Sequence, residues 1–215
     1  MPYGIEPTVV RYDDAKEYIL DADVLFYHGL GPVSTAVIRT ATLSEYAHVG
    51  MAGWTNGESK YKELMAYEML WTGGQGHVLS SHVDTRKGVH VYRCSDSFTS
   101  YRWDSRTRKV HGETRVLDRK AAVHQMRKFC RPDEYGKMHL FWTACTRMPF
   151  VRWVWKQPTN DEIADRKRPP YCSEAVAFAL RHAFTDIVRN TPDHYTSPGA
   201  LARSPLLHYM FTLVP

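Results

Sequence analysis

One cysteine stands where its sulfur could act as a nucleophile. Cys172 follows Pro169 and Pro170, and each proline keeps the residue before it out of the helical region. After Cys172 no residue breaks a helix, and the apolar residues recur at the spacing of one buried face. We therefore expect Cys172 in the first turn of a helix, where unpaired N–H groups and the helix dipole stabilise a thiolate. An ordinary packed cysteine would also suit this place, because free cysteines are often buried.

A nucleophilic sulfur needs a base, and the base needs a group that orients it. His48 lies near the start of an apolar strand expected at 46–51, and Glu68 lies in the middle of a second one at 64–71. Asn56-Gly57 predicts a hairpin turn between them. A buried carboxylate is costly without a partner, and a histidine on the neighbouring strand would supply one. Taken singly, His48 also fits a core histidine bonded to a carbonyl, and Glu68 an exposed edge or an arginine salt bridge.

These residues must be positioned by strands and helices, and the pattern of expected elements predicts an α+β fold in one domain over 1–215. After a lead-in at 1–20, we expect a small antiparallel sheet packed against the cysteine-bearing helix. Further strands are expected at 24–27, 78–83, 88–93 and 206–214, and a flexible loop at 73–76. Further helices are expected at 13–20, 34–41, 118–130, 135–147 and from 198 onward.

Composition is that of a globular protein, with 215 residues and a net charge of +5. The four cysteines form no C-x-x-C pair, so we expect neither a zinc site nor a disulfide framework. His77, His82 and His90 lack metal-ligand spacing and are interpreted as surface and strand histidines, with no cofactor expected. No signal peptide or transmembrane run is visible, which predicts a reduced, cytoplasmic protein.

Two segments combine cations with aromatic residues. The basic stretch 96–116 is interpreted as an insertion or loop, either solvated or binding nucleic acid through its cations and aromatic rings. The stretch 150–156 contains Trp153 and Trp155, which would suit contact with a membrane surface or an acyl chain, or a lid over the core. The net positive charge permits partners such as nucleic acid or anionic membrane but does not require them.

The sequence resembles the YiiX/YebB-like branch of the NlpC superfamily, whose members are circularly permuted papain-like proteins. The resemblance covers most of the chain from about residue 20, and the cysteine helix follows the histidine strand as the permuted branch requires. It departs at Ala47, where the family often has serine, and in the basic stretch 96–113. The matching pieces, in the family's order, are Asp21-Ala22-Asp23-Val24-Leu25-Phe26, 29–42, Tyr46-Ala47-His48-Val49-Gly50, Glu68, Gly88-Val89-His90-Val91, Tyr171-Cys172-Ser173-Glu174 and Ser197-Pro198-Gly199-Ala200-Leu201.

This resemblance implies Cys172 as nucleophile, His48 as base and Glu68 as the polar third member. The Cys172 N–H would form half of an oxyanion hole, with Tyr46 or Tyr171 as the other half. We therefore expect a cysteine hydrolase that cleaves a peptide or other amide through an acyl-enzyme. A thioesterase, lipid acyl hydrolase or acyltransferase with the same triad is the alternative. A non-catalytic protein that binds nucleic acid or membrane on this fold is a second one.

Overall fold

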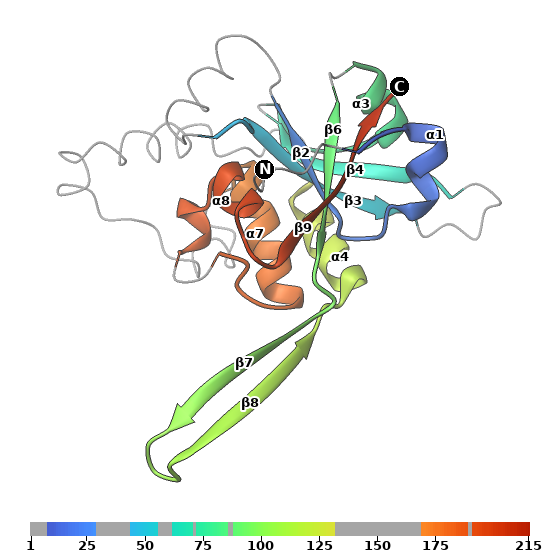
Figure 1. The fold of residues 1–215 in the computed structure, drawn as a ribbon. Helices are drawn as coiled ribbons and strands as arrows, with labels where there is room; N and C mark the ends of the chain where they lie inside the picture. The colour runs from blue at the N-terminus through green and yellow to red at the C-terminus, as the bar shows by residue number, and fades with distance from the viewer. Residues whose placement is uncertain are drawn as a thin grey trace.

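A computed structural model describes residues 8–28, 44–55, 62–70, 72–85, 88–131, 169–188 and 191–215 of the chain. They form an α+β fold in which a seven-stranded sheet carries helices on both faces (Figure 1). The elements, in chain order, are β1 (Val9–Arg11), α1 (Tyr12–Ala15), η1 (Lys16–Tyr18), β2 (Val24–Tyr27), β3 (His48–Trp54), β4 (Leu64–Leu70), β5 (Gly73–Val78), α3 (Leu79–Thr85), β6 (Val89–Cys94), β7 (Ser97–Asp104), β8 (Lys109–Val116), α4 (Arg119–Phe129), α7 (Cys172–Ala183), η3 (Asp193–Tyr195), α8 (Pro198–Ala202) and β9 (Leu207–Val214).

The main sheet is larger than the sequence predicted, and it is mixed. Its strand order is β1-β9-β6-β2-β3-β4-β5, and every neighbouring pair is antiparallel except β1 with β9. The parallel pair joins β1 to the last strand of the chain, β9. β1 lies in the segment 1–20, which was expected to be a lead-in. The strands predicted at 24–27, 46–51, 64–71, 88–93 and 206–214 are confirmed as β2, β3, β4, β6 and β9, and the first three are buried along most of their length.

Two hydrophobic cores cover the two faces of this sheet. On one face, α4, α7 and α8 bury residues such as Met126, Val176 and Leu201. On the other, α1, α3 and Ile19 pack against strand residues such as Leu25 and Ala52. The positions of these helices on either side of the strands are visible in Figure 1. Because both faces are covered, a charged group on a central strand is removed from water and needs a partner.

A buried ion pair anchors the approach to β2. The carboxylate of Asp23 is fully buried and lies 2.7 Å from Nη2 of Arg93 and 3.5 Å from Nη1 of Arg119. It also accepts a hydrogen bond from the backbone N–H of Leu20 at 2.9 Å. These contacts satisfy the carboxylate, which burial alone would strongly disfavour.

The region between β4 and β6 differs from the prediction. The glycine-rich stretch expected as a loop is strand β5, and 78–83, expected as a strand, belongs mostly to helix α3. A Cβ on Gly74 would lie 2.0 Å from the carbonyl oxygen of Phe129, so this glycine lets β5 approach the end of α4. Leu79 and Val83 are four residues apart and both fully buried, which is the spacing of a helix face.

The basic stretch 96–116 is a β-hairpin, formed by β7 and β8, rather than a loop. It projects away from the rest of the described structure (Figure 1). Its strands pair from Ser97 with Val116 to Asp104 with Lys109, and Tyr101 is 75% exposed. Because this part of the hairpin is solvated, its strands lack the apolar alternation by which half-buried strands are recognised.

Several predicted features fall outside the described residues. These are the helices at 34–41 and 135–147, the Asn56-Gly57 turn, and Trp153 with Trp155. The helices predicted at 118–130 and from Cys172, and the capped helix at Pro198, are confirmed as α4, α7 and α8. In the ranges that the structure covers, no helix is both long and apolar enough to cross a bilayer.

Candidate active site

Cys172 is the first residue of α7, as the sequence predicted. Tyr171 precedes it in extended backbone, and the Tyr171 N–H donates to the Glu174 carboxylate at 3.3 Å. This contact fixes the first turn of the helix in the manner of a capping box. Cys172 is only 4% exposed, so its sulfur lies in a protected environment at the positive end of the helix dipole.

His48 is the first residue of β3 and lies between the thiol and the carboxylate. Its Nε2 lies 3.1 Å from Oε2 of Glu68, and Cys172 lies close enough to the ring to raise the pKa of His48. Because Glu68 occupies Nε2, Nδ1 is the nitrogen left for the sulfur. The ring packs 5.5 Å from that of Tyr27 on β2, and His48 is 4% exposed. The structure therefore brings together the three residues that the sequence singled out.

Gly50 explains how a carboxylate on β4 reaches a histidine on β3. Gly50 and Glu68 are directly paired across the two strands, and His48 is two residues before Gly50 on the same strand face. A Cβ at Gly50 would lie 2.7 Å from Cγ of Glu68 and 3.0 Å from the carbonyl oxygen of Tyr67. The absence of a side chain thus gives Glu68 room to extend toward His48. Gly50 is a functional residue without a chemical group of its own, and a glycine within an apolar strand is the signal from which a close approach can be predicted.

The environment of His48 favours its charged form. Burial acts to lower the pKa of the imidazole, but the Cys172 thiolate and the Glu68 carboxylate raise the pKa of His48 to about 9. Both neighbours act in the same direction because each is an anion that hydrogen-bonds the imidazolium. Near neutral pH, His48 is therefore protonated, and an imidazolium is the kind of neighbour that activates a nucleophilic cysteine.

The other described cysteines have different surroundings. Burial raises the pKa of Cys94 to about 12 and that of Cys130 to about 11. The Cys130 thiol donates to the carbonyl of Gln75 at 3.5 Å. The cysteines in the described ranges form no disulfide, and Cys172 lies beside His48. Cys145 falls outside these ranges.

His82 is a member of the site that sequence reasoning missed. It was interpreted as a surface or strand histidine, but it lies on helix α3 and is 8% exposed. Its Nδ1 lies 3.4 Å from Oε1 of Glu68, the oxygen not bonded to His48. The carboxylate of Glu68 therefore lies between two imidazole rings. The ring of His77 is 4.7 Å from that of His82, centroid to centroid.

The two tyrosines expected at the oxyanion hole have other partners. The Tyr171 hydroxyl donates to the carbonyl of Thr196 at 3.3 Å, so its single proton is already engaged. The Tyr46 hydroxyl lies 3.0 Å from Nδ1 of His90 and 3.0 Å from the hydroxyl of Tyr92. His90 is buried and lies on strand β6, which agrees with its interpretation as a strand histidine. A role for either tyrosine on a substrate stays a prediction.

The arrangement can perform nucleophilic chemistry on a carbonyl with protein groups alone. No group of three or more histidine, cysteine, aspartate or glutamate side chains suited to a metal ion occurs in the described ranges. The chain Glu68–His48–Cys172 supplies an orienting anion, a proton carrier and a sulfur nucleophile. Neither the protein-family models nor the curated proteins compared with this chain contain a match to it.

Proposed function

We propose that this protein is a cysteine hydrolase that cleaves an amide through a covalent acyl-enzyme. One observation carries the proposal, namely the buried arrangement in which Glu68 hydrogen-bonds His48 and Cys172, at a helix N-terminus, lies beside the same imidazole. The order of the three residues in the sequence also agrees with the resemblance to the permuted papain-like proteins. That family assignment, and the papain-like topology that it implies, are part of the proposal.

The first half-reaction forms the acyl-enzyme. The Cys172 thiolate attacks the carbonyl carbon, and the resulting oxyanion accepts a hydrogen bond from the Cys172 N–H, which has no partner within the helix. As the carbon–nitrogen bond breaks, the His48 imidazolium gives its proton to the leaving amine. Glu68 holds the ring so that Nδ1 faces the sulfur and the leaving group.

The second half-reaction releases the acid. His48, now neutral, takes a proton from a water molecule while that water attacks the thioester carbonyl. The carbon–sulfur bond then breaks, the carboxylic acid leaves, and the thiolate–imidazolium pair is restored. An acceptor other than water in this step would make the protein an acyltransferase, and a thioester or lipid ester in the first step would make it a thioesterase or lipid acyl hydrolase.

Thiol labelling tests the nucleophile without knowledge of the substrate. Wild-type protein treated with limiting iodoacetamide at pH 7 should be alkylated first at Cys172, as read by peptide mass spectrometry. His48→Ala should slow this alkylation by at least about tenfold, since a thiol at its ordinary pKa is only a few per cent ionised at pH 7. Cys94→Ala is the matched control and should leave the rate unchanged. Equal labelling of Cys172 with and without His48 would contradict the proposal.

Turnover assays separate the classes of substrate. A panel of small amides, p-nitrophenyl esters and acyl thioesters should be cleaved by wild-type protein and not by Cys172→Ala. Amides at the head of the ranking would support the peptidase or amidase proposal. A strong preference for acyl thioesters or long-chain esters would favour the lipid alternative.

The projecting hairpin supports a second candidate function, binding of nucleic acid. Its cations Arg106 and Arg115 are solvent-exposed, with Arg115 Nε 2.9 Å from Oε1 of Glu113, and Tyr101 offers an exposed ring on the same hairpin. Cations and aromatic rings together bind phosphates and bases. Salt-sensitive binding of single-stranded DNA that is lost in Arg106→Glu but kept in Cys172→Ala would support this function. Absence of binding at low salt would exclude it, and binding to anionic vesicles instead would indicate a membrane partner.

A further inference from the structure

Both neighbours of Cys172 in the sequence are tied to one backbone carbonyl. The carbonyl of Thr196 accepts a hydrogen bond from Ser173 Oγ at 2.7 Å and another from the Tyr171 hydroxyl at 3.3 Å. A carbonyl oxygen has two lone pairs, so it can accept both donors. The first turn of a helix has N–H groups without intrahelical partners, and helix ends fray. These two bonds therefore hold the turn that carries the Cys172 sulfur.

Ser173 places a hydroxyl where packing alone would not require one. Its side chain is fully buried, and Ala175 and Val176, which follow it on α7, are buried and apolar. A buried hydroxyl is costly unless it is hydrogen-bonded, and alanine would occupy the same place without that cost. What the hydroxyl adds is a directed bond from the turn of the candidate nucleophile to another segment of the chain.

The segment that supplies the carbonyl is itself tied to α7 at a second point. The Thr196 N–H donates to the carbonyl of Asp193 at 2.9 Å, at the end of η3. The buried carboxylate of Asp193 accepts a hydrogen bond from Nε of Arg181 at 2.9 Å. Arg181 lies on α7 eight residues after Ser173, a separation of about 12 Å along the helix axis. The carbonyl of Thr196 therefore belongs to a fixed support rather than to a free loop.

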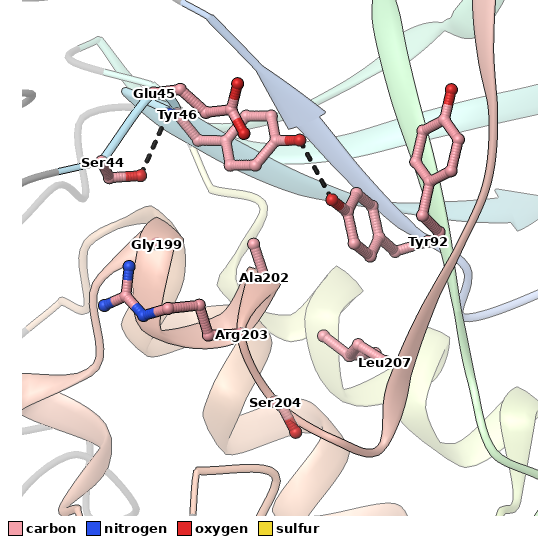
Figure 2. A pocket seen from close by; sticks show the side chains of 10 residues that line it. Ser44, Glu45, Tyr46, Tyr92, Gly199, Ala202, Arg203, Ser204 and Leu207 are labelled. Atoms are coloured by element: carbon pink, nitrogen blue, oxygen red, sulfur yellow. Dashed lines mark hydrogen bonds between the residues drawn. The ribbon is translucent and has the colours of Figure 1, made fainter. Parts of the chain in front are cut away.

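The same segment continues into α8, which contacts the approach to His48. A Cβ on Gly199 would lie 2.5 Å from Oγ and 2.6 Å from Cβ of Ser44, so these two residues pack directly against each other. Ser44 Oγ accepts a hydrogen bond from the backbone N–H of Tyr46 at 3.0 Å, two residues before His48. Figure 2 shows Gly199 below Ser44 and the bond from Ser44 to the Tyr46 backbone. The chain that supports the nucleophile thus also meets the segment that leads to the base.

A pocket of about 640 Å³ lies beside this contact, between α8 and the segment that leads into β3. In Figure 2, Glu45 and Tyr46 lie on one side of it, and Arg203 and Leu207 lie on the other. Because this volume is open, α8 meets the approach to β3 at Gly199 rather than along its whole length. The contact therefore sets how far α8 lies from the strand that carries His48.

We infer that the segment 196–199 is a spacer that sets the separation between nucleophile and base, with Ser173 and Gly199 as positioning residues. Ser173 ties the spacer to the turn of Cys172, and Gly199 seats it against the segment that leads to His48. A misplacement of about 1 Å between reacting groups can slow a reaction by about 100-fold. The inference rests on the proposed function, because it takes Cys172 as the nucleophile and His48 as its base.

Two variants of the full-length protein test the spacer from its two ends. Ser173→Ala releases the turn of the nucleophile, and Gly199→Ala pushes against Ser44. We expect Ser173→Ala to slow alkylation of Cys172 by iodoacetamide at pH 7 by about three- to tenfold, which corresponds to the loss of one hydrogen bond, and Gly199→Ala to slow it at least as much. Each should also lower the pKa of His48 in long-range ¹H–¹⁵N spectra, because burial lowers that pKa and Cys172, which opposes burial, moves away from the ring. In a Cys172→Ala background, neither change should shift the His48 titration further.

Control variants separate positioning from stability. Ser204→Ala removes another buried hydroxyl, which donates to the carbonyl of Ile187 at 2.6 Å, and Gly53→Ala overpacks the core against Val123. Both should lose stability in urea unfolding and leave the alkylation rate and the His48 titration unchanged. If the spacer variants lose stability but match these controls in both readouts, they affect packing alone and the inference is overturned.

Hydrogen exchange distinguishes failure of the spacer from failure of the hydrolase. The amide protons of Tyr171 and Ala175 form the bonds that close the first turn of α7, and Ser173→Ala should make both exchange faster. If the turn loosens and His48 shifts, but alkylation of Cys172 in the parent protein does not depend on His48, the hydrolase is refuted and the spacer stands. If the turn loosens and the His48 titration does not move, the spacer is refuted.

Asp193→Asn tests the same support from its far end, and it takes the place of Ser173→Ala if that variant does not fold. It weakens the bond to Arg181 without changing any group beside Cys172. We expect slower alkylation and a lower pKa of His48, as for Ser173→Ala. An alkylation rate and a His48 titration equal to those of the parent protein would show that the support does not position the nucleophile.

Discussion

Replacing Gly50 with alanine should disconnect Glu68 from His48 without touching any ionisable group. The new Cβ would lie 2.7 Å from Cγ of Glu68, a distance that packed carbon atoms do not tolerate. Cγ is near the root of the side chain, and the Tyr67 carbonyl at 3.0 Å is backbone, so the carboxylate must move. We expect Gly50→Ala to rotate Glu68 away from the imidazole and to break the 3.1 Å contact.

The size of the effect follows from the bond that is lost. A hydrogen bond to a charged group contributes about 1.5–3 kcal/mol, and about 1.4 kcal/mol corresponds to one pH unit of pKa. The pKa of His48 should therefore fall from about 9 by roughly one to two pH units. Overpacking should also lower the free energy of unfolding by about 1–3 kcal/mol. Misorientation of the ring should slow turnover by about 100-fold.

Gly53→Ala is the matched control in the same strand. Its Cβ would lie 2.6 Å from Cγ1 of Val123, so it overpacks the core against α4 instead of crowding Glu68. Both variants should lose stability in urea unfolding, but only Gly50→Ala should shift the His48 titration in long-range ¹H–¹⁵N spectra and slow alkylation of Cys172. Identical titrations of His48 in the two variants would show that Gly50 does not position Glu68.

Four further outcomes are expected. Cys172→Ala should lower the pKa of His48 in the same spectra, because burial lowers it and the thiolate that opposes burial is gone. The pKa of His48 is about 9 in the folded protein and 6.5 ordinarily, so its contribution to stability is full below pH 6.5 and is lost as the pH rises through about 9. Urea unfolding from pH 6 to 10 should show this decline, and His48→Ala should flatten it. His82→Phe should change the pH dependence of alkylation while Cys172 remains reactive, because the Oε1 contact of Glu68 is lost; an unchanged profile would assign His82 to packing alone. Asp23→Asn should cost about 1–3 kcal/mol of stability by removing the carboxylate that pairs with Arg93 and Arg119, although Arg119 keeps its contact with Asp96, and Cys172 reactivity should be unaffected.

The sequence located the catalytic candidates because their chemistry conflicts with their surroundings. Glu68 is a carboxylate in an apolar strand, and such a group needs a partner wherever the strand lies. The prolines before Cys172 predicted the start of α7, and the structure begins the helix at that residue. The hydrophobic pattern of the sequence was sufficient to predict β4 and α7, because each is buried along one continuous stretch.

The residues that support this chain were harder to predict because their roles come from tertiary contacts. Gly74 resembles a loop glycine until α4 is known to end against it. His82 meets Glu68 only because α3 packs on the same side of the sheet, and 78–83 carries no clear signal for a helix. Likewise, Arg203 and Glu45 are 158 positions apart in the sequence, and only the fold places them around one pocket.

The burial of the site argues for function rather than structural support. Glu68 is fully buried and His48 is 4% exposed, so both are removed from the water that would solvate their charges. Replacing a buried ion pair with apolar residues of similar volume is often neutral or stabilising by about 1–4 kcal/mol. A core that required only packing between β3 and β4 would therefore be at least as stable with aliphatic side chains at these positions. What this pair supplies, and aliphatic residues would not, is an oriented proton carrier for the Cys172 thiol.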